Sequence, residues 1–153
     1  MLDYRVAQTA DIERMAQCRL ADPAAGPADE RMAAYFAGKH HPQQASAPRI
    51  GYVAAIGDLV VGYTAGHLTR RHQCDGELQY LFVSPAHRRL GIAGELVLRM
   101  FQWFVTQGAY KICVNVAPEN EPARAFYGSL GATELGQYWS VWLDIRARVR
   151  GAA

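Results

Sequence analysis

The sequence predicts a mixed α/β fold, in which one central sheet carries helices on its faces. Seven segments have strand-like composition and alternation, and four have helical spacing, in the order strand, helix, helix, strand, strand, strand, helix, strand, helix, strand, strand. The chain has 153 residues, of which 50% are hydrophobic and 20% charged. This length and composition fit one globular domain with an adequate core.

The N-terminal part is expected to form one strand and two helices. Residues 2–6 alternate, and Thr9 can cap a helix over residues 10–20. The repeating face of that helix consists of Ile12, Met15, Ala16 and Arg19. Residues 21–30 contain two prolines and a glycine, so they end the helix and form a candidate mobile connection. A second helix is expected at 29–37.

Three strands follow a surface loop. Residues 38–49 are polar and contain prolines, which predicts the loop. Residues 50–56 and 59–68 flank a Gly-Asp turn and are expected to pair as a hairpin. In the third strand, at 77–83, strict alternation places Glu77 on the same face as Leu81 and Val83, and Leu78, Tyr80 and Phe82 on the other.

The C-terminal part alternates helices and strands. Residues 91–107 carry the apolar stripe of a helix packed on a sheet, and 111–116 form the next strand. Asn120 is placed to cap a helix over 120–130. Two last strands are expected at 133–137 and 139–145, followed by a solvated basic tail.

Residues 84–97, SPAHRRLGIAGELV, are the most informative stretch. A turn of small and basic residues follows an apolar strand and opens an amphipathic helix. In such a turn the backbone N–H groups converge on a ligand, and the positive end of the helix dipole lies behind them. The stretch therefore predicts a site for a cofactor that carries phosphate.

Composition argues against several other classes of protein. A formal charge of +2 does not support nucleic-acid binding, and no apolar run is long enough to span a bilayer. The N-terminus does not have the pattern of a secretion signal. Three widely spaced cysteines fit neither a disulfide framework nor a metal site and favour the cytoplasm. Cys18 and Cys113 are expected to pack as small apolar side chains.

Two motifs resemble those of the GNAT superfamily of acyl-CoA-dependent N-acetyltransferases. Arg88 to Ala93 fits the family's cofactor pattern Gln/Arg-x-x-Gly-x-Gly/Ala, and NEPARAFYGSLGA, residues 120–132, fits its second signature. The resemblance implies a mostly antiparallel sheet of six to seven strands with about four helices, splayed at the two strands that hold the cofactor. It also implies a single domain over 1–153, with acceptor-side helices at about 9–40, a cofactor core at 50–131 and C-terminal strands at 132–146.

The resemblance further implies acetyl-CoA as cofactor. Its pyrophosphate would lie on the N–H groups of Arg88, Arg89, Leu90, Gly91, Ile92, Ala93 and Gly94. Its pantetheine arm would extend along Leu81, Phe82 and Val83. Leu90 departs from the basic or small residue usual in relatives, and this puts one phosphate contact in doubt. Arg89 can equally be a solvated charge, and Ile92 fits packing better than binding.

Tyr127 and Glu77 are the candidate catalytic residues. Tyr127 aligns with the family tyrosine near the cofactor sulfur, where a phenol can protonate the departing thiolate. Glu77 falls where some members place a general base, and desolvation by Leu81 and Val83 would raise its pKa. A water chain is the alternative base, since a carboxylate at a strand start can simply be exposed.

Other polar groups have open roles. The oxyanion donor is expected to be the N–H of Phe82 or Val83. Asn120 can contact the cofactor, cap its helix, or do both, and Asn115 can hold a water or the acceptor or point outward. The aromatic residues that can wall the acceptor, or simply pack, are Tyr35, Phe36, Tyr138 and Trp139.

The function implied is transfer of an acetyl group from acetyl-CoA to a primary amine by direct attack in a ternary complex. The acceptor, whether a small molecule or a protein amine, is not readable from the sequence. A non-catalytic module that binds or senses acyl-CoA is the alternative, and an unrelated nucleotide-binding domain is disfavoured because the turn follows a late strand. Exposed strand edges make a homodimer plausible.

Overall fold

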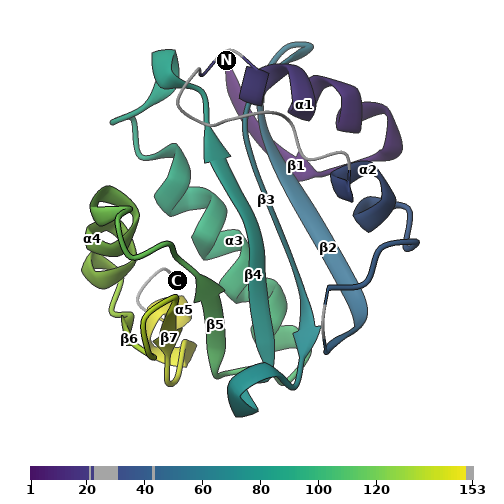
Figure 1. Ribbon diagram of the computed structural model, residues 1–153. Coiled ribbons are helices and arrows are strands. Elements are labelled where there is room, and N and C mark those ends of the chain that lie inside the picture. Colours follow the sequence, from purple (N-terminus) through teal and green to yellow (C-terminus); the bar gives the residue numbers. More distant parts are fainter. Residues whose placement is uncertain (21, 23–30, 43, 151–153) are drawn as a thin grey trace.

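The computed structural model describes residues 1–20, 22, 31–42 and 44–150. One sheet of seven strands forms its centre, in the order β1-β2-β3-β4-β5-β7-β6 (Figure 1). The strands are β1 (Leu2–Val6), β2 (Ala45–Ile56), β3 (Leu59–Thr69), β4 (Gly76–Val83), β5 (Ile112–Asn115), β6 (Thr133–Glu134) and β7 (Trp139–Trp142). All neighbours pair antiparallel except β4 and β5, which are parallel. The predicted mixed, mostly antiparallel sheet is confirmed.

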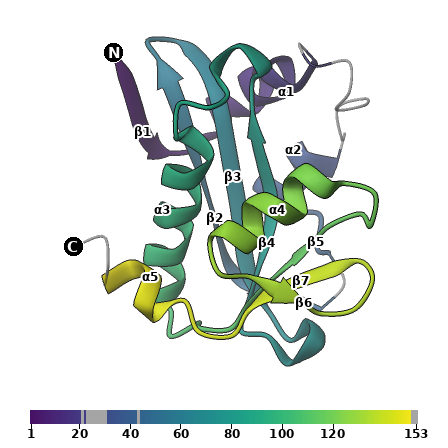
Figure 2. The same ribbon diagram turned by 90° about the vertical axis from the view of Figure 1, so that its left-hand side faces the viewer.

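Helices cover both faces of the sheet (Figure 2). The first two, α1 (Ile12–Leu20) and α2 (Arg31–Phe36), pack with β3 and β4 through Met15, Met32, Tyr63 and Phe82. On the other face lie α3 (Ile92–Thr106), α4 (Glu121–Ser129) and α5 (Arg146–Arg150). The core between α3 and the sheet is built on the predicted stripe, because Leu96, Val97, Met100 and Phe104 are all buried.

The parallel strands β4 and β5 separate part-way along their length. They pair from Gly76↔Ile112 to Leu78↔Val114, and no pairing between them follows in the described residues. Since β4 continues to Val83, its second half has no strand beside it on that edge. The splay expected between the two cofactor-holding strands is therefore present.

A β-bulge in β4 overturns the alternation expected for that strand. Ala65 of β3 pairs with Tyr80 while the next residue, Gly66, pairs with Leu78, so Gln79 is an extra residue. Beyond the bulge Leu81 and Val83 face α3, and before it Leu78 does as well. The prediction that Leu78 shares a face with Tyr80 and Phe82 was wrong, because one extra residue exchanges the two faces.

Three further expectations need correction. Strand β2 begins at Ala45 within the expected loop and skips Ala47 and Pro48 in its pairing, since proline has no N–H to donate. Thr9 does not cap α1: it begins a 3-10 turn, η1 (Thr9–Asp11), after Gln8, whose N–H donates to the carboxylate of Asp11 at 2.7 Å.

The expected basic tail is partly helical. Helix α5 packs on α3, and Ile145 just before it is fully buried. Its arginines are exposed, as the sequence predicts, but the sequence does not predict the helix. The candidate mobile connection at 21–30 lies, apart from Asp22, outside the described residues.

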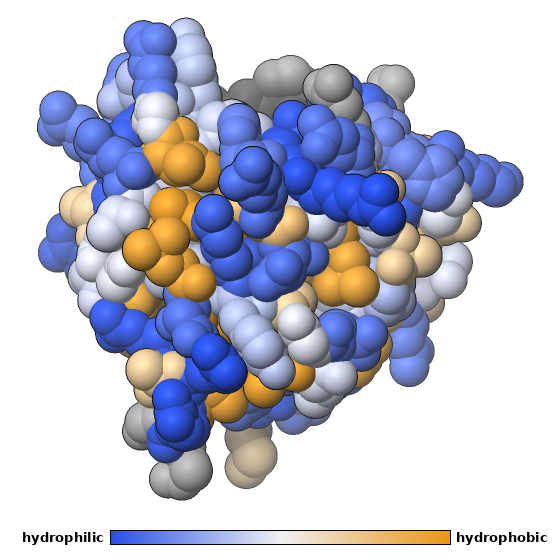
Figure 3. Space-filling view, turned by 90° about the horizontal axis from the view of Figure 1, so that it is seen from below, coloured by the Kyte–Doolittle hydropathy of each residue, from blue (hydrophilic) through white to orange (hydrophobic). Residues whose placement is uncertain are grey.

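The surface is mixed in character. On the lower face, apolar side chains form small groups separated by hydrophilic ones (Figure 3). Within the described part of the chain, no helix combines the length and hydrophobicity needed to cross a membrane, and no cluster of three potential metal ligands occurs.

Candidate active site

The turn between β4 and α3 presents an open row of backbone amides. A 3-10 turn, η4 (Pro85–His87), follows β4, and Arg89 and Gly91 then adopt positive φ values of 63° and 80°. Gly91 stands at the N-cap of α3, so the first amides of that helix have no carbonyl one turn earlier to bond. A Cβ placed at Gly91 or Gly94 would meet no atom within 4 Å. The geometry thus fits the predicted diphosphate site.

The side chains of the turn mostly support it rather than point at a ligand. Arg88 donates from Nε to the carbonyl of Val83 at 3.0 Å and from Nη2 to the carboxylate of Asp22 at 2.6 Å. Arg89 and Leu90 are exposed, whereas Ile92, the first residue of α3, is 2% exposed and packs against the sheet. The alternative that Ile92 packs is confirmed, and the turn's binding capacity rests on its backbone.

A cavity of about 310 Å³ opens where β4 and β5 separate. Its lining comes from both sides of the sheet, with Arg19 from α1 on one side and Ala123 and Tyr127 from α4 on the other. The remaining described lining residues are Leu78, Gln79, Tyr80, Leu81, Val114, Asn115, Val116, Ala117 and Asn120. A larger cavity, about 370 Å³, lies between α3 and α5, but the polar candidates converge on the smaller one.

The free edge of β4 offers backbone groups to an extended ligand. The N–H of Ser84 donates to Val61 of β3, and the carbonyl of Tyr80 accepts from the Thr64 hydroxyl. Since the direction of backbone groups alternates along a strand, those of Phe82 face β3 while those of Leu81 and Val83 face the free edge. Of the two amides predicted as oxyanion donors, the Val83 N–H is the one directed to the splay.

Tyr127 borders the cavity between β4 and β5, which is where a residue close to the cofactor sulfur is expected. It is 8% exposed, lines the cavity, and its ring contacts Trp142 edge-on at 5.6 Å between centroids. Burial raises the pKa of its hydroxyl to about 12. The phenol is therefore protonated at neutral pH and can donate a proton.

Both asparagines have defined places. The Oδ1 of Asn120 accepts from the N–H of Ala123 at 3.2 Å, which confirms the predicted cap of α4, and Asn120 also lines the cavity. Asn115 is exposed at the end of β5 and lines the cavity as well. The two residues therefore border the same space.

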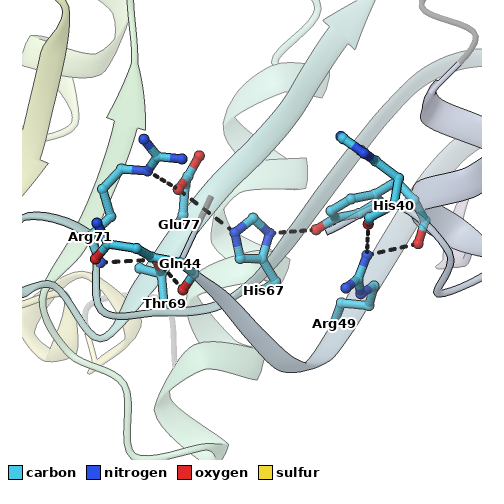
Figure 4. A network of polar contacts seen from close by, with 8 residues as sticks. His40, Gln44, Arg49, His67, Thr69, Arg71 and Glu77 are labelled. Carbon is cyan, nitrogen blue, oxygen red and sulfur yellow. Dashed lines mark hydrogen bonds and ion pairs between the residues drawn. The ribbon is translucent and has the colours of Figure 1, made fainter. Parts of the chain in front are cut away.

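Glu77 lies in a buried polar network (Figure 4). Its Oε1 accepts from Arg71 Nε at 3.2 Å and lies 3.7 Å from His67 Nε2. The Nδ1 of His67 lies 2.8 Å from the hydroxyl of Tyr35. Burial raises the pKa of Tyr35, so its hydroxyl stays protonated and can donate to Nδ1.

This network corrects the expected surroundings of Glu77. Its residue partner on β3 is His67, which faces α2, so Glu77 does not share a face with Leu81 and Val83. Glu77 is 4% exposed and is not among the described residues that line the cavity. Any exchange of protons with a ligand there would need an intermediary.

The aromatic residues predicted to wall the acceptor site differ in burial. Tyr35 is fully buried and packs against Phe36 and Tyr80, so it does not wall an open site. Trp139 is half-buried beneath Arg71, whose guanidinium carbon lies 4.9 Å from its ring centre, while Tyr138 is 52% exposed.

Sequence reasoning missed several residues that line the cavity, among them the polar residues Arg19 and Gln79. The sequence places Arg19 only on the repeating face of its helix, after Ile12, Met15 and Ala16. A charged residue that continues an apolar helix face is a sign that its side chain does not simply point into solvent. Gln79 gave no signal, because its place depends on the bulge. Its Oε1 is buried with no hydrogen-bond partner, as expected of an acceptor that a ligand N–H satisfies.

Comparisons agree with this architecture. The profile described as "Acetyltransferase (GNAT) family" matches residues 13–132. A protein from Desulfovibrio desulfuricans, described as an acetyltransferase of that family, superposes with a TM-score of 0.76 at 15% identity, over 94% of this chain and 99% of the other. An acetyltransferase from Thermus thermophilus superposes with a TM-score of 0.70 at 19% sequence identity, over 93% of this chain and 96% of the other.

A third structure contains a cofactor. The PaiA N-acetyltransferase of Thermoplasma acidophilum, in complex with coenzyme A, gives a TM-score of 0.69 at 15% identity, over 94% of this chain and 99% of the other. Identities this low show a shared fold. Among curated proteins there is no match.

Proposed function

Because the chain belongs to the acetyltransferase (GNAT) family, we propose that it transfers an acetyl group from acetyl-CoA to a primary amine, by direct attack in a ternary complex. The observation that carries the proposal is the alignment of three features: the amide turn at Gly91, the free edge of β4 and the cavity that ends at Tyr127. Together they offer a seat for a diphosphate, an extended amide arm and a thioester.

The cofactor seat follows from the backbone. The N–H groups from Arg89 to Gly94 hold the diphosphate, favoured by the positive end of α3, whereas the N–H of Arg88 already donates to the carbonyl of Pro85. The arm extends along Leu81 and Val83, whose backbone groups face the splay, and its amides use them as a neighbouring strand would. This places the thioester in the cavity between β4 and β5.

Tyr127 supplies the proton that the reaction requires. The amine attacks the thioester carbonyl, the oxyanion is held by the N–H of Leu81, which faces the splay and belongs to a residue that lines the cavity, and the thiolate leaves. Tyr127 protonates it, because its hydroxyl carries a proton at neutral pH and its side chain lines the cavity.

The amine loses its proton to water in the cavity, with Glu77 as the acceptor behind that water. Glu77 accepts a hydrogen bond from Arg71, its Oε1 lies 3.7 Å from His67 Nε2, and it lies outside the cavity lining. A water between Glu77 and the amine is therefore part of the proposal.

The test is an assay of free thiol with acetyl-CoA and a panel of primary amines. We expect thiol release with at least one amine. Tyr127→Phe should lower kcat roughly 10²- to 10⁴-fold while CoA affinity stays unchanged. Tyr110→Phe, a change of the same kind in a tyrosine outside the cavity lining, is the control and should behave as wild type.

Two outcomes would count against the proposal in different ways. Equal kcat for Tyr127→Phe and wild type would remove Tyr127 as the acid. Tight CoA binding with no thiol release from any amine would favour the acyl-CoA-sensing alternative.

A further inference from the structure

Gln79 occupies a position in β4 that strand alternation does not fix. It is the extra residue of the bulge, between the paired residues Leu78 and Tyr80. In the described residues Leu78 is also the last of β4 to pair with β5, and β4 continues past it without a neighbour on that edge (Figure 1). Gln79 therefore stands where the splay closes, and it lines the cavity.

The side-chain amide of Gln79 has an unused acceptor. Its Oε1 is buried, and no donor in the described part of the chain bonds to it. A buried acceptor without a donor lowers stability, so such groups in folded proteins are normally satisfied by a ligand or an ordered water. Because Gln79 lines the cavity, the donor that satisfies Oε1 is one that enters the cavity.

Two ligands can bring such a donor, namely the amide arm of the cofactor and the acceptor amine. The arm finds its partners closer to the amide turn, since the backbone groups of Leu81 and Val83 face the free edge of β4. Gln79 lies beyond both along β4, on the side away from Gly91. The thioester ends the arm at this depth, so the donor that reaches Gln79 belongs to the amine that attacks it.

We propose that Gln79 binds the attacking amine by accepting one of its N–H groups at Oε1. A primary ammonium ion that becomes an amide loses two protons and keeps the third, so one N–H remains for Gln79 throughout the reaction. When the C–N bond forms, positive charge develops on the nitrogen and strengthens this hydrogen bond.

The proton balance leaves the contact with Gln79 intact. One proton leaves the ammonium ion to water before the attack. The second passes afterwards to Tyr127, which gives its own proton to the thiolate as the C–S bond breaks. This inference rests on the proposed function and adds a residue that binds and orients its substrate.

The test measures kcat/KM, CoA affinity and melting temperature in three variants, with the amine that releases thiol fastest in the panel. Gln79→Met keeps the length of the side chain without the acceptor, and Gln79→Glu keeps an acceptor oxygen. Gln102→Met is the control, because Gln102 is exposed on α3 and lies outside the lining of this cavity.

Gln79→Met should lower kcat/KM for the amine roughly 10- to 100-fold, the usual effect of losing a hydrogen bond to a charged group. Its CoA affinity should equal that of wild type. Its melting temperature should equal or exceed that of wild type, because the change removes a buried acceptor that the protein itself does not satisfy. Gln79→Glu should retain more kcat/KM than Gln79→Met, and Gln102→Met should match wild type throughout.

A purely structural role for Gln79 would lower stability instead. A fall in the melting temperature of Gln79→Met, or a kcat/KM equal to that of wild type, overturns the inference while thiol release by wild type still supports the acetyltransferase. A loss of CoA affinity in Gln79→Met would assign the amide to the cofactor arm and overturn it as well. Equal kcat/KM in Gln79→Glu and Gln79→Met would show that the reaction needs no acceptor here, with the same consequence. No thiol release from any amine by wild type overturns the proposed function, and the inference with it.

Discussion

Gly94 and Gly128 are both helical glycines around which a side chain would have room, but only Gly94 lies beside the amide turn. Alanine is favoured over glycine inside a helix by about 0.5–1 kcal/mol. The N–H of Gly94, however, is among those proposed to hold the diphosphate, so an added methyl group there would stand beside the ligand. Alanine substitution at the two positions therefore distinguishes an effect on stability from an effect on CoA binding.

Gly94→Ala should raise the melting temperature slightly and weaken CoA binding on the order of tenfold, which is about 1.4 kcal/mol. Gly128→Ala should raise the melting temperature and leave CoA affinity unchanged. Thermal melts and calorimetric titration measure both. Unchanged CoA affinity in Gly94→Ala would show that the diphosphate does not lie against this turn of α3.

At the residue scale, the sequence was informative where a role depends on local chain geometry. Gly91 and Asn120 belong to motifs that lie within a few residues, and both occupy the predicted conformations. Arg19 and His67 depend on contacts with distant elements, since Arg19 meets β4 and His67 meets α2. No local pattern could reveal those contacts.

At the element scale, α4 depends on its cap. The side chain of Asn120 accepts from the Ala123 N–H, and Pro122 occupies the first turn, where its missing N–H costs nothing. The same asparagine lines the cavity, so its two possible roles need a measurement that tells them apart.

Asn120→Ala should lower the free energy of unfolding by about 0.5–2 kcal/mol through loss of the cap. Asn120→Asp should keep most of that stability, because aspartate is an equally good cap. If Asn120 acts only as a cap, CoA affinity in both variants equals that of wild type. A fall in affinity in Asn120→Asp, with stability retained, would contradict a purely structural role.

Strand β4 shows where prediction of an element fails. Its existence and its ends were predicted within one residue, because its composition is that of a buried strand. Which of its residues lie on which face of the sheet was not predicted, because the bulge at Gln79 follows from the pairing of β4 with β3. Since the side-chain period of a strand is two, this single extra residue moved Glu77 from the expected apolar surroundings into the network with His67.

At the scale of the whole molecule, an ion pair near the N-terminus links β1 to η1. The Nη1 and Nη2 nitrogens of the Arg5 guanidinium each donate to the Asp11 carboxylate at 2.7 Å, and Asp11 is 2% exposed. The hydrogen bonds from Arg5 hold the pKa of Asp11 below its ordinary value. A carboxylate with a lowered pKa in the folded state contributes stability above its unfolded pKa, about 4, and loses it as the pH falls further.

Asp11→Asn should lower the free energy of unfolding at pH 7 by about 1–3 kcal/mol, the usual worth of hydrogen bonds to a charged group. Its stability should also fall less steeply than that of wild type below pH 4. Glu13→Gln, a change at an exposed position on α1, is the control. Parallel slopes for Asp11→Asn and wild type in denaturant titrations from pH 2 to 7 would refute this assignment.

The order of strands explains how the whole fold serves the site. One parallel pair in an otherwise antiparallel sheet lets β4 and β5 diverge, and α4 begins at the opening, where Asn120 and Ala123 line the cavity. The order of elements predicted the mixed sheet, and the resemblance to the family predicted the splay. The C-terminal helix was missed because its basic sequence has no apolar stripe, and Val149 is its one residue packed against the core in the described structure.

In the proposed cofactor site, the amides around Gly91 bind the diphosphate of coenzyme A. Titration calorimetry with CoA and with pantetheine, which has the same thiol-bearing arm without the diphosphate, tests it most directly. We expect measurable binding of CoA and at least 100-fold weaker binding of pantetheine. Equal affinity for the two ligands, or no binding of CoA by demonstrably folded protein, would contradict it.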